Sequence, residues 1–356
     1  MEFALSDEQQ MIAETARAFF AENATSARTR AAMAASGPDA GIDRALWQAF
    51  CTELGLSGIG IAEEAGGAGL GFVELALVAE AAGAQVAALP MLGSLALAAQ
   101  AIAAGGTAAQ RADVLPGLLS GEIIAGYVHD AGLKAEDNRL TGRDAFVAHG
   151  AAAGLFVVTS NQGAWLVRAD APGLTVIPQT TMDQTRPMAR VTLDGVVGEP
   201  LADAAAAMAR AQACGWITLA AEALGGAQAA LDRTVAYARE RVQFGRPIGS
   251  FQAYKHRLAD LVIEIEQARS AVWWAACAVD EGAEDAALAL HAAKSFAADT
   301  YFLCAGNMIQ LHGGIGFTWE HDAHLFFKRA RAIQTALGQG SWHREQVATL
   351  ILGDAA

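Results

Sequence analysis

The chain has 356 residues, of which 53% are hydrophobic, and it carries a formal net charge of −14. A chain of this size and apolar content buries a large core, and its acidic balance leaves no basic stripe for a nucleic-acid backbone. Its cysteines lie far apart without CxxC spacing, which argues against a zinc site or a disulfide framework and favours a reducing cytoplasm: Cys51, Cys214, Cys277 and Cys304.

The N-terminal segment is acidic and lacks the basic and apolar regions of a signal peptide. Alanine-rich stretches at 95–109 and 202–213 contain no run of about eighteen strongly apolar residues, so they predict closely packed small-residue helices and no membrane span. We therefore expect a cytoplasmic protein.

From residue 6 to about residue 122, apolar residues recur at helical spacing, and Ser6 followed by Glu8, Gln9 and Gln10 indicates a capped helix start. The glycine-rich stretch 58–71 follows no predicted strand and lacks the spacing of a dinucleotide fingerprint. It predicts a bare loop between helices.

The pattern then changes to short β-type runs, and turn residues such as Asn138, Gly142 and Gly173 separate them: 123–128, 145–148, 155–159, 164–167, 174–177 and 189–193. Helical spacing returns after residue 201, with candidate helices at 204–241, 251–280, 283–311 and 322–334. The predicted fold class is α+β: an N-terminal α-helical domain (1–122), a small, mostly antiparallel middle β domain (123–200) and a C-terminal four-helix bundle (201–356).

Two motifs carry the strongest functional signal. Residues 241–252, RVQFGRPIGSFQ, combine the always-charged Arg241 with amide and aromatic side chains beside a glycine turn, a set that suits a diphosphate and an adenine. Residues 310–317, QLHGGIGF, include Gly313 and Gly314, which let backbone amides approach a phosphate or ribose. At this separation the pair resembles the two flavin-binding signatures of the acyl-CoA dehydrogenase family; an ordinary surface arginine and a helix-ending turn are the alternative.

The resemblance covers the whole length, since the α, β, α order and the passages 3–23, 46–71, 232–261 and 308–331 are similar to this family. The short length and the phrases 183–194 and 316–321 resemble members that act in bacterial sterol side-chain breakdown. The resemblance implies a flavoprotein oxidoreductase of lipid metabolism that binds FAD, desaturates an acyl-CoA thioester at Cα–Cβ, and passes electrons to an electron-transfer flavoprotein.

In this family the two motifs reach FAD mainly across a subunit interface. Carried over by position, the residues that we call the clasp are Arg241 at the pyrophosphate, Gln243 and Phe244 at the adenine end, Gln310, Gly313 and Gly314 on the other side, and Gln252 near the same site. The family's loops that hold the flavin ring within the same subunit, in cis, match this sequence less well than the clasp does. Residues 125–138 lack the family's T-E-P-x-x-G-S-D phrase, and at the W-[IV]-T-N phrase Phe146 can still stack, whereas Ala148 cannot donate a hydrogen bond.

The catalytic glutamate of the family, which takes the α-proton, has no counterpart here. Its usual position falls on Leu337, or on Gln339 after a two-residue shift, and its alternative position falls on Gly215. Glu222 is a candidate substitute base, because it shares a helix face with Gly215 about 10 Å further along the axis. Its other interpretation is a hydrogen-bonded, partly buried glutamate that stabilises the bundle.

No metal site is predicted, because the histidines show no metal-ligand spacing: His129, His149, His312, His321, His324 and His343. The pairs Trp273-Trp274 and Phe326-Phe327 are typical of bundle core and subunit interface.

Three hypotheses remain open. The chain is the base-lacking subunit of a heteromer, for example a heterotetramer, and lends its clasp to the FAD of a related dehydrogenase subunit. Alternatively, it is a homo-oligomeric FAD enzyme with Glu222 as an unorthodox base, or a non-catalytic scaffold that binds acyl-CoA or a protein partner.

Overall fold

The structure is a computed structural model, which describes residues 4–129 and 132–353 except for the side chain of Asp144. The chain divides into two compact units. The helical unit comprises Met1–Ser26, Phe72–Ala87 and Trp216–Ala356, and the mixed unit comprises Ala27–Gly71 and Ala88–Gly215. The predicted boundaries 1–122, 123–200 and 201–356 follow a different division and stay a prediction.

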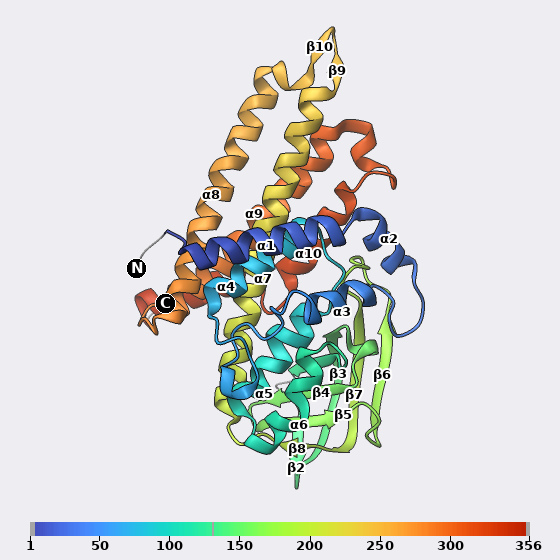
Figure 1. Cartoon of the computed structure of the whole chain (residues 1–356), viewed down its shortest axis with the longest axis vertical. Coiled ribbons are helices and arrows are strands. Elements are labelled where there is room, and N and C mark those ends of the chain that lie inside the picture. Colours follow the sequence, from blue (N-terminus) through green and yellow to red (C-terminus); the bar gives the residue numbers. More distant parts are fainter. Residues whose placement is uncertain (1–3, 130–131, 354–356) are drawn as a thin grey trace. The chain divides into compact units, whose positions relative to one another are not determined.

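The helical unit contains long helices joined by short turns (Figure 1). Its elements are α1 (Asp7–Asn23), α4 (Phe72–Ala84), the larger part of α7 (Ala204–Glu240), β9 (Val242–Gln243), β10 (Arg246–Pro247), η4 (Ile248–Ser250), α8 (Gln252–Asp280), α9 (Ala286–His312), η5 (Gly313–Phe317), α10 (Ala323–Thr335) and α11 (Gly340–Leu352). Helix α9 packs against α8, α10 and α11, so most of its apolar residues are buried.

Local capping fixes where two helices of this unit begin. Ser6 and Gln9 form a capping box at the start of α1, which confirms the predicted helix start. Helix α4 takes its cap from another helix, because the Asp280 carboxylate accepts hydrogen bonds from the Phe72 and Val73 amides at 2.8 and 3.0 Å. This distant cap satisfies amide donors that the first turn of α4 leaves open.

Helices α4 and α7 cross in direct backbone contact. A Cβ on Gly83 would lie 2.1 Å from the Glu222 carbonyl oxygen, and one on Gly225 would lie 1.9 Å from the Glu80 carbonyl oxygen. A side chain at either glycine would therefore force one helix to shift, because the atom that it meets belongs to the backbone. This crossing places the middle of α7 against α4.

The mixed unit joins two sheets to short helices. Its helical elements are α2 (Ser26–Ala34, whose first residue belongs to the helical unit), α3 (Arg44–Thr52), η1 (Glu63–Ala65), η2 (Met91–Ala99), α5 (Gln100–Gly105), α6 (Ala108–Leu119), η3 (Gly150–Ala152) and the first part of α7. Its strands are β1 (Ala125–His129), β2 (Lys134–Glu136), β3 (Arg139–Ala148), β4 (Leu155–Ser160), β5 (Gly163–Arg168), β6 (Leu174–Gln179), β7 (Met188–Val197) and β8 (Glu199–Pro200).

The strands form two four-stranded sheets in the orders β1-β4-β5-β8 and β2-β3-β7-β6. The pairing of β1 with β4 is parallel, and the other pairs in both sheets are antiparallel. Their alternating apolar residues share one buried core that includes Val128, Phe156, Trp165 and Val191. The expected mostly antiparallel β region is confirmed.

Helix η2 is a π-helix of nine buried residues. It lies against the sheets, since the Ser94 hydroxyl accepts a hydrogen bond from the Ala125 amide at 3.1 Å and a Cβ on Gly93 would lie 3.0 Å from the Ala148 carbonyl oxygen. The sequence predicted small-residue helices at 95–109, and η2 and α5 lie there. Small side chains permit this close approach to the β strands.

The predicted α+β class and the order of helical, β and helical segments are confirmed, and the long helices begin and end within about three residues of their expected bounds. Helix α11 and the β9–β10 hairpin were not predicted from the sequence pattern. Hairpin strands of two residues are too short to show a period, and the first half of α11 is polar. Among the described helices, none is long and apolar enough to cross a membrane.

Candidate functional site

The first half of the clasp is a tight hairpin that joins α7 to α8 at the tip of these helices (Figure 1). Gln243 pairs with Arg246 across the hairpin, and the Ile248 amide donates to the Arg241 carbonyl at 2.8 Å. Phe244 and Gly245 make the turn with φ of +55° and +76°. Because a phenylalanine rarely adopts positive φ, this turn holds its side chain outward at a conformational cost.

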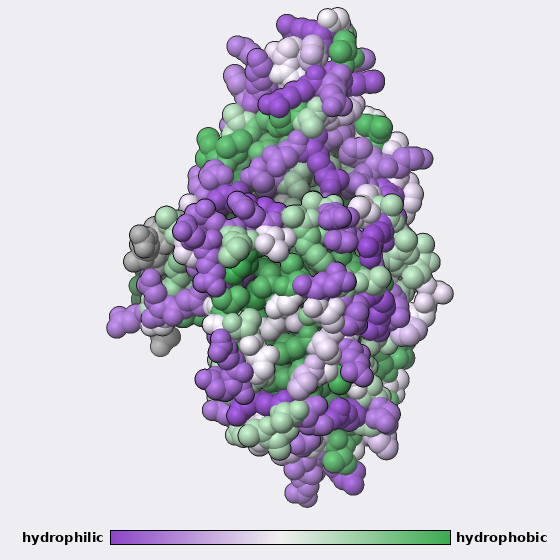
Figure 2. All heavy atoms as spheres, viewed as in Figure 1, coloured by the Kyte–Doolittle hydropathy of each residue, from purple (hydrophilic) through white to green (hydrophobic). Residues whose placement is uncertain are grey.

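The hairpin presents its functional groups to solvent. Phe244 is 92% exposed, and Arg241, Gln243 and Gln252 are also exposed. Figure 2 shows a mainly hydrophilic surface at this end, broken by a few hydrophobic side chains. Phe251 packs against the hairpin. Its ring meets the Phe244 ring edge-on, with centroids 6.2 Å apart, and its centroid lies 4.1 Å from the Arg246 guanidinium. An exposed arginine beside an exposed aromatic ring is suited to binding a nucleotide diphosphate, whereas neither group is placed to stabilise a folded core.

The second half of the clasp is the turn after α9. Gly313 has φ of +63°, and a Cβ at Gly313 or Gly314 would meet no atom of the described chain within 4 Å. Gly316 differs, because a Cβ there would lie 2.5 Å from the Ile309 carbonyl oxygen. Gly313 and Gly314 therefore expose bare backbone, whereas Gly316 closes the turn against α9. Gln310, on the last turn of α9, is exposed.

The ends of three helices bring the two halves of the clasp together. Tyr237 of α7 stacks on His312 of α9, with ring centroids 4.4 Å apart and an interplanar angle of 23°. The Tyr254 hydroxyl of α8 donates to the carbonyl oxygen of Leu311. The hairpin and the glycine turn thus belong to one framework, and the donor set that they expose fits the diphosphate and adenine end of FAD.

The cis positions lie in the mixed unit. Phe146 on β3 is 63% exposed, and Ala148, two residues later, is half-buried and carries no donor on its side chain. Strand β1 supplies residues 125–129 of the segment 125–138, in which residues 130 and 131 lie outside the described residues. These positions offer an aromatic face and backbone, with fewer side-chain donors than the family pattern.

Leu337, at the predicted principal base position, lies in the turn between α10 and α11 and has φ of +52°. Its carbonyl oxygen accepts a hydrogen bond from the Trp216 indole at 2.9 Å, and the His343 Nε2 lies 3.2 Å from it. The shifted position, Gln339, is exposed and precedes α11, and the alternative position, Gly215, lies on α7. No side chain at these three positions accepts a proton at neutral pH.

Glu222 is buried inside the helical unit and forms an ion pair with Arg329. The side chains of both residues are 3% exposed, and Arg329 also donates to the Ala87 carbonyl at 3.5 Å. This geometry matches the interpretation of Glu222 as a residue that stabilises the bundle, because a carboxylate held by a guanidinium is a poor proton acceptor. Its role as a substitute base stays a prediction.

A polar cluster that no sequence motif predicted surrounds Leu337. Lys294 and His343 are fully buried, and the Nδ1 atoms of His291 and His343 lie 2.9 Å apart. Burial, the positive charge of Lys294 and the neighbouring His291 lower the pKa of His343 to about 4, and burial lowers the pKa of His291. The sequence did contain a signal for this cluster, since His291 and Lys294 are the titratable residues in the mainly apolar stretch 286–298.

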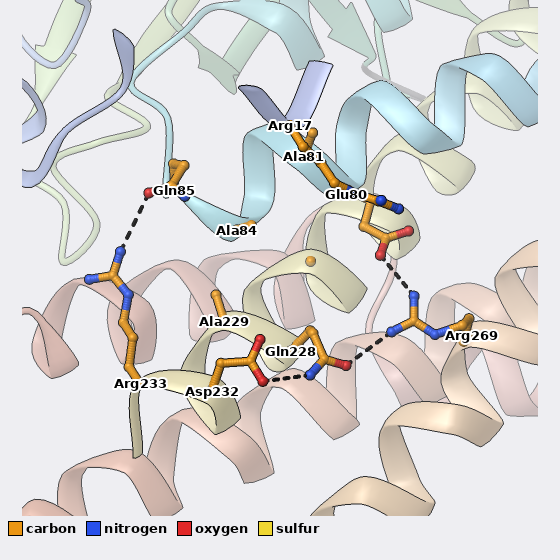
Figure 3. Close-up of a pocket in the computed structure, with 11 residues that line it drawn as sticks. Arg17, Glu80, Ala81, Ala84, Gln85, Gln228, Ala229, Asp232, Arg233 and Arg269 are labelled. Atoms are coloured by element: carbon orange, nitrogen blue, oxygen red, sulfur yellow. Dashed lines mark hydrogen bonds and ion pairs between the residues drawn. The ribbon is translucent and has the colours of Figure 1, made fainter. Parts of the chain in front are cut away.

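A pocket of about 560 Å³ lies apart from the clasp, between α1, α4, α7 and α8 (Figure 3). Gln228 bridges its walls, since it donates to Asp232 at 2.9 Å and accepts from Arg269 at 3.0 Å. Arg269 also pairs with Glu80 at 2.8 Å. The lining carries three arginines and two carboxylates, so these contacts offset most of its charge and leave a small positive excess. Among the described residues, the pocket included, no group of three or more histidine, cysteine or acidic side chains could hold a metal ion.

Comparison with known families identifies the scaffold that carries these groups. Residues 6–122 match the acyl-CoA dehydrogenase N-terminal domain, and residues 205–352 match the acyl-CoA dehydrogenase C-terminal domain. The chain belongs to the acyl-CoA dehydrogenase family. The resemblance carried by the two motifs is thereby confirmed, and FAD is the cofactor of this family of oxidoreductases.

Individual relatives agree with this membership. Acyl-CoA dehydrogenase IpdE2 of Mycobacterium tuberculosis is 40% identical over 332 residues, which cover 91% of each chain. A variant of the Tcur3481–Tcur3483 steroid ACAD has a TM-score of 0.87 and 34% identity, and covers 98% of this chain and 99% of that one. The ChsE4–ChsE5 complex of M. tuberculosis has a TM-score of 0.90 and 27% identity, with all of both chains covered.

Proposed function

We propose that this chain is the base-lacking subunit of a heteromeric acyl-CoA dehydrogenase that desaturates a bulky, steroid-type acyl-CoA thioester between Cα and Cβ. The observation that carries the proposal is a contrast within the helical unit. The clasp residues are all exposed, whereas the turn at the predicted base position presents Leu337. An exposed clasp without a base suits a chain that completes the cofactor site of another subunit.

The residues of this chain have definite tasks in such a complex. FAD, when bound, supplies the acceptor for the hydride that leaves the β-carbon. Arg241 donates hydrogen bonds to the pyrophosphate, and Phe244 packs its exposed ring against the adenine. Gln243, Gln252 and Gln310 offer amide groups along the same surface, and the bare backbone of Gly313 and Gly314 approaches the cofactor closely. A partner subunit supplies the carboxylate that takes the α-proton.

The substrate and partner rest on the relatives. One similar structure is named a steroid ACAD, and another is named as a complex of two components. These names support a steroid-type acyl group and a related dehydrogenase chain as the partner. An electron-transfer flavoprotein is the proposed electron acceptor, and the cytoplasm is the proposed location, since the described cysteines are all free thiols.

The FAD content per chain tests the proposal. The chain is purified alone and after co-expression with a related dehydrogenase chain that keeps the glutamate. We expect little FAD alone, and flavin near one FAD per two chains, together with acyl-CoA oxidation, in the complex. Full FAD occupancy of the chain by itself would refute the heteromer and favour the homo-oligomeric enzyme; no FAD with any such partner would favour the scaffold.

A matched pair of variants locates the cofactor contact. Phe244→Ala removes an aromatic ring that is 92% exposed, so it leaves the fold intact and lowers FAD retention in the complex. Met11→Ala, at a position 61% exposed on α1, is the control and leaves FAD retention unchanged. Equal FAD retention in both variants would exclude Phe244 from the cofactor site.

A further inference from the structure

The turn from Ala336 to Gly338 has an uncommon backbone. Leu337 has φ of +52° and Gly338 has φ of +104°. A leucine in the left-handed region costs free energy, so other contacts must hold it there. At Gly338 a Cβ would lie 2.6 Å from the Trp342 ring and 2.9 Å from His343 Nε2, which leaves room for glycine alone.

Three side chains donate hydrogen bonds to the carbonyl oxygens around this turn. The Trp216 indole and the His343 imidazole converge on the Leu337 carbonyl at 2.9 and 3.2 Å. The Lys294 ammonium reaches the Ile333 carbonyl at 3.0 Å, at the end of α10, and the Gly338 carbonyl at 3.4 Å. Donors from α7, α9 and α11 thus hold one short connection.

The hydrogen bonds define the protonation of the cluster. Because a carbonyl accepts, the Nε2 of His343 carries its proton, and the Nδ1 then accepts from the Nδ1–H of His291, 2.9 Å away. The Trp216 ring packs on both imidazoles, with centroids 4.6 Å from His291 and 5.4 Å from His343. His343 is fully buried with both ring nitrogens engaged, so it acts on the turn and not on a substrate.

We propose that Trp216, Lys294 and His343 are positioning residues that fix the backbone of Ala336–Gly338, so that the chain keeps a rigid, ligand-facing turn where its family carries the base. Leu337 itself is half-buried and contributes an apolar side chain to this turn. The rigidity of the turn is independent of the proposed function. Its role toward the acyl-CoA thioester rests on that function.

Hydrogen exchange tests the rigidity in the purified chain. Trp216→Phe keeps an aromatic ring and removes the N–H donor. Trp274→Phe is the matched control, because it also removes an indole N–H hydrogen bond, to Asp285 at 3.2 Å, at a site on α8 outside the turn. We expect the amides at 336–339 to exchange roughly tenfold faster in Trp216→Phe and at an unchanged rate in Trp274→Phe.

A second series guards against a general loss of stability. His343→Leu removes the donor, and His343→Gln restores an amide N–H, so exchange at the turn should rise in the first variant and return most of the way in the second. Unchanged exchange in both Trp216→Phe and His343→Leu would overturn the proposal. An equal rise along α9 and α11 would also overturn it, because the residues would then stabilise the whole bundle.

Turnover in the reconstituted complex tests the role toward the ligand. If the turn faces the thioester, Trp216→Phe raises KM for the acyl-CoA roughly tenfold while kcat changes less than about twofold. An unchanged KM beside faster exchange would remove the ligand-facing role and leave a rigid turn. If the wild-type complex itself shows no oxidation, the proposed function fails, and the exchange result still decides the rigidity.

Discussion

Replacing Glu222 by glutamine separates its two interpretations in one variant. Glu222 and Arg329 form an ion pair in which each side chain is 3% exposed. The replacement preserves the shape of the side chain and removes its negative charge. If Glu222 stabilises the bundle, the variant loses stability; if Glu222 is the base, it loses turnover.

The structure sets the size of the stability loss. Removing one partner of a buried ion pair leaves the other charge without compensation and costs about 3–5 kcal/mol. The glutamine oxygen can still accept a hydrogen bond from Arg329, and Arg329 keeps its contact with the Ala87 carbonyl at 3.5 Å, so we expect the lower end, about 3 kcal/mol. This loss is a large share of the free energy of unfolding of a typical domain, which is roughly 5–15 kcal/mol.

Urea denaturation followed by circular dichroism measures the loss, and acyl-CoA oxidation by the reconstituted complex measures turnover. Glu266→Gln is the control, because Glu266 is 59% exposed and lies 3.4 Å from Arg269, so its removal should change stability by less than about 1 kcal/mol. The double variant Glu222→Gln with Arg329→Gln should be no less stable than Glu222→Gln alone, since it removes the uncompensated charge.

One result would refute this reasoning. If Glu222→Gln unfolds at the wild-type urea concentration and loses turnover by several orders of magnitude, the ion pair contributes little and Glu222 is the base. Normal turnover in a folded but less stable variant would confirm the structural role.

Three further predictions concern single groups. The pKa of His343 is lowered from its ordinary value of 6.5 to about 4 in the folded chain, so His343 contributes stability that is present above pH 6.5 and is lost as pH falls toward 4. His343→Gln should flatten that part of a curve of unfolding free energy against pH measured by urea denaturation. An equal slope in both proteins would contradict the burial of a neutral imidazole. Burial raises the pKa of Cys304 to about 12, so a thiol reagent should modify the half-buried Cys277 first, which mass spectrometry would detect. Early labelling of Cys304 would show that α9 opens readily. Gly225→Ala places a Cβ 1.9 Å from the Glu80 carbonyl oxygen, so it should lower the free energy of unfolding measured in urea by about 1–3 kcal/mol. Gly314→Ala has open space around its Cβ and should lower it by less than about 0.5 kcal/mol. Equal losses would mean that α4 separates from α7 freely.

Local patterns predicted much of this protein correctly. Helical spacing located α7, α8, α9 and α10, because apolar residues recur along each helix, both where one face is buried, as in α8, and where most sides are buried, as in α9. The change to short β-type runs located the strands of the middle region. The motifs at 241–252 and 310–317 identified the family, since the chemistry that they supply depends on residues close together in the chain.

Other features depend on contacts between distant residues, and no local period encodes them. Glu222 meets Arg329 at a separation of 107 residues, and His291 meets His343 at a separation of 52. The parallel pairing of β1 with β4 and the π-helical form of η2 likewise arise from packing. Periodicity marks which residues become buried, but it does not specify their partners.

The sequence by itself determined the α+β class and the family, because residue identity and short-range spacing suffice for each, and it predicted Leu337 and Gly215 as the positions where a base is missing. Only the tertiary structure decided that Glu222 lies in a buried ion pair, that α1 and α4 join the C-terminal helices in one unit, and that Trp216, Lys294 and His343 converge on the turn at Leu337. The physical reason is that burial and hydrogen bonding between distant segments are set when helices pack, after the local pattern has fixed only which face of each helix is apolar.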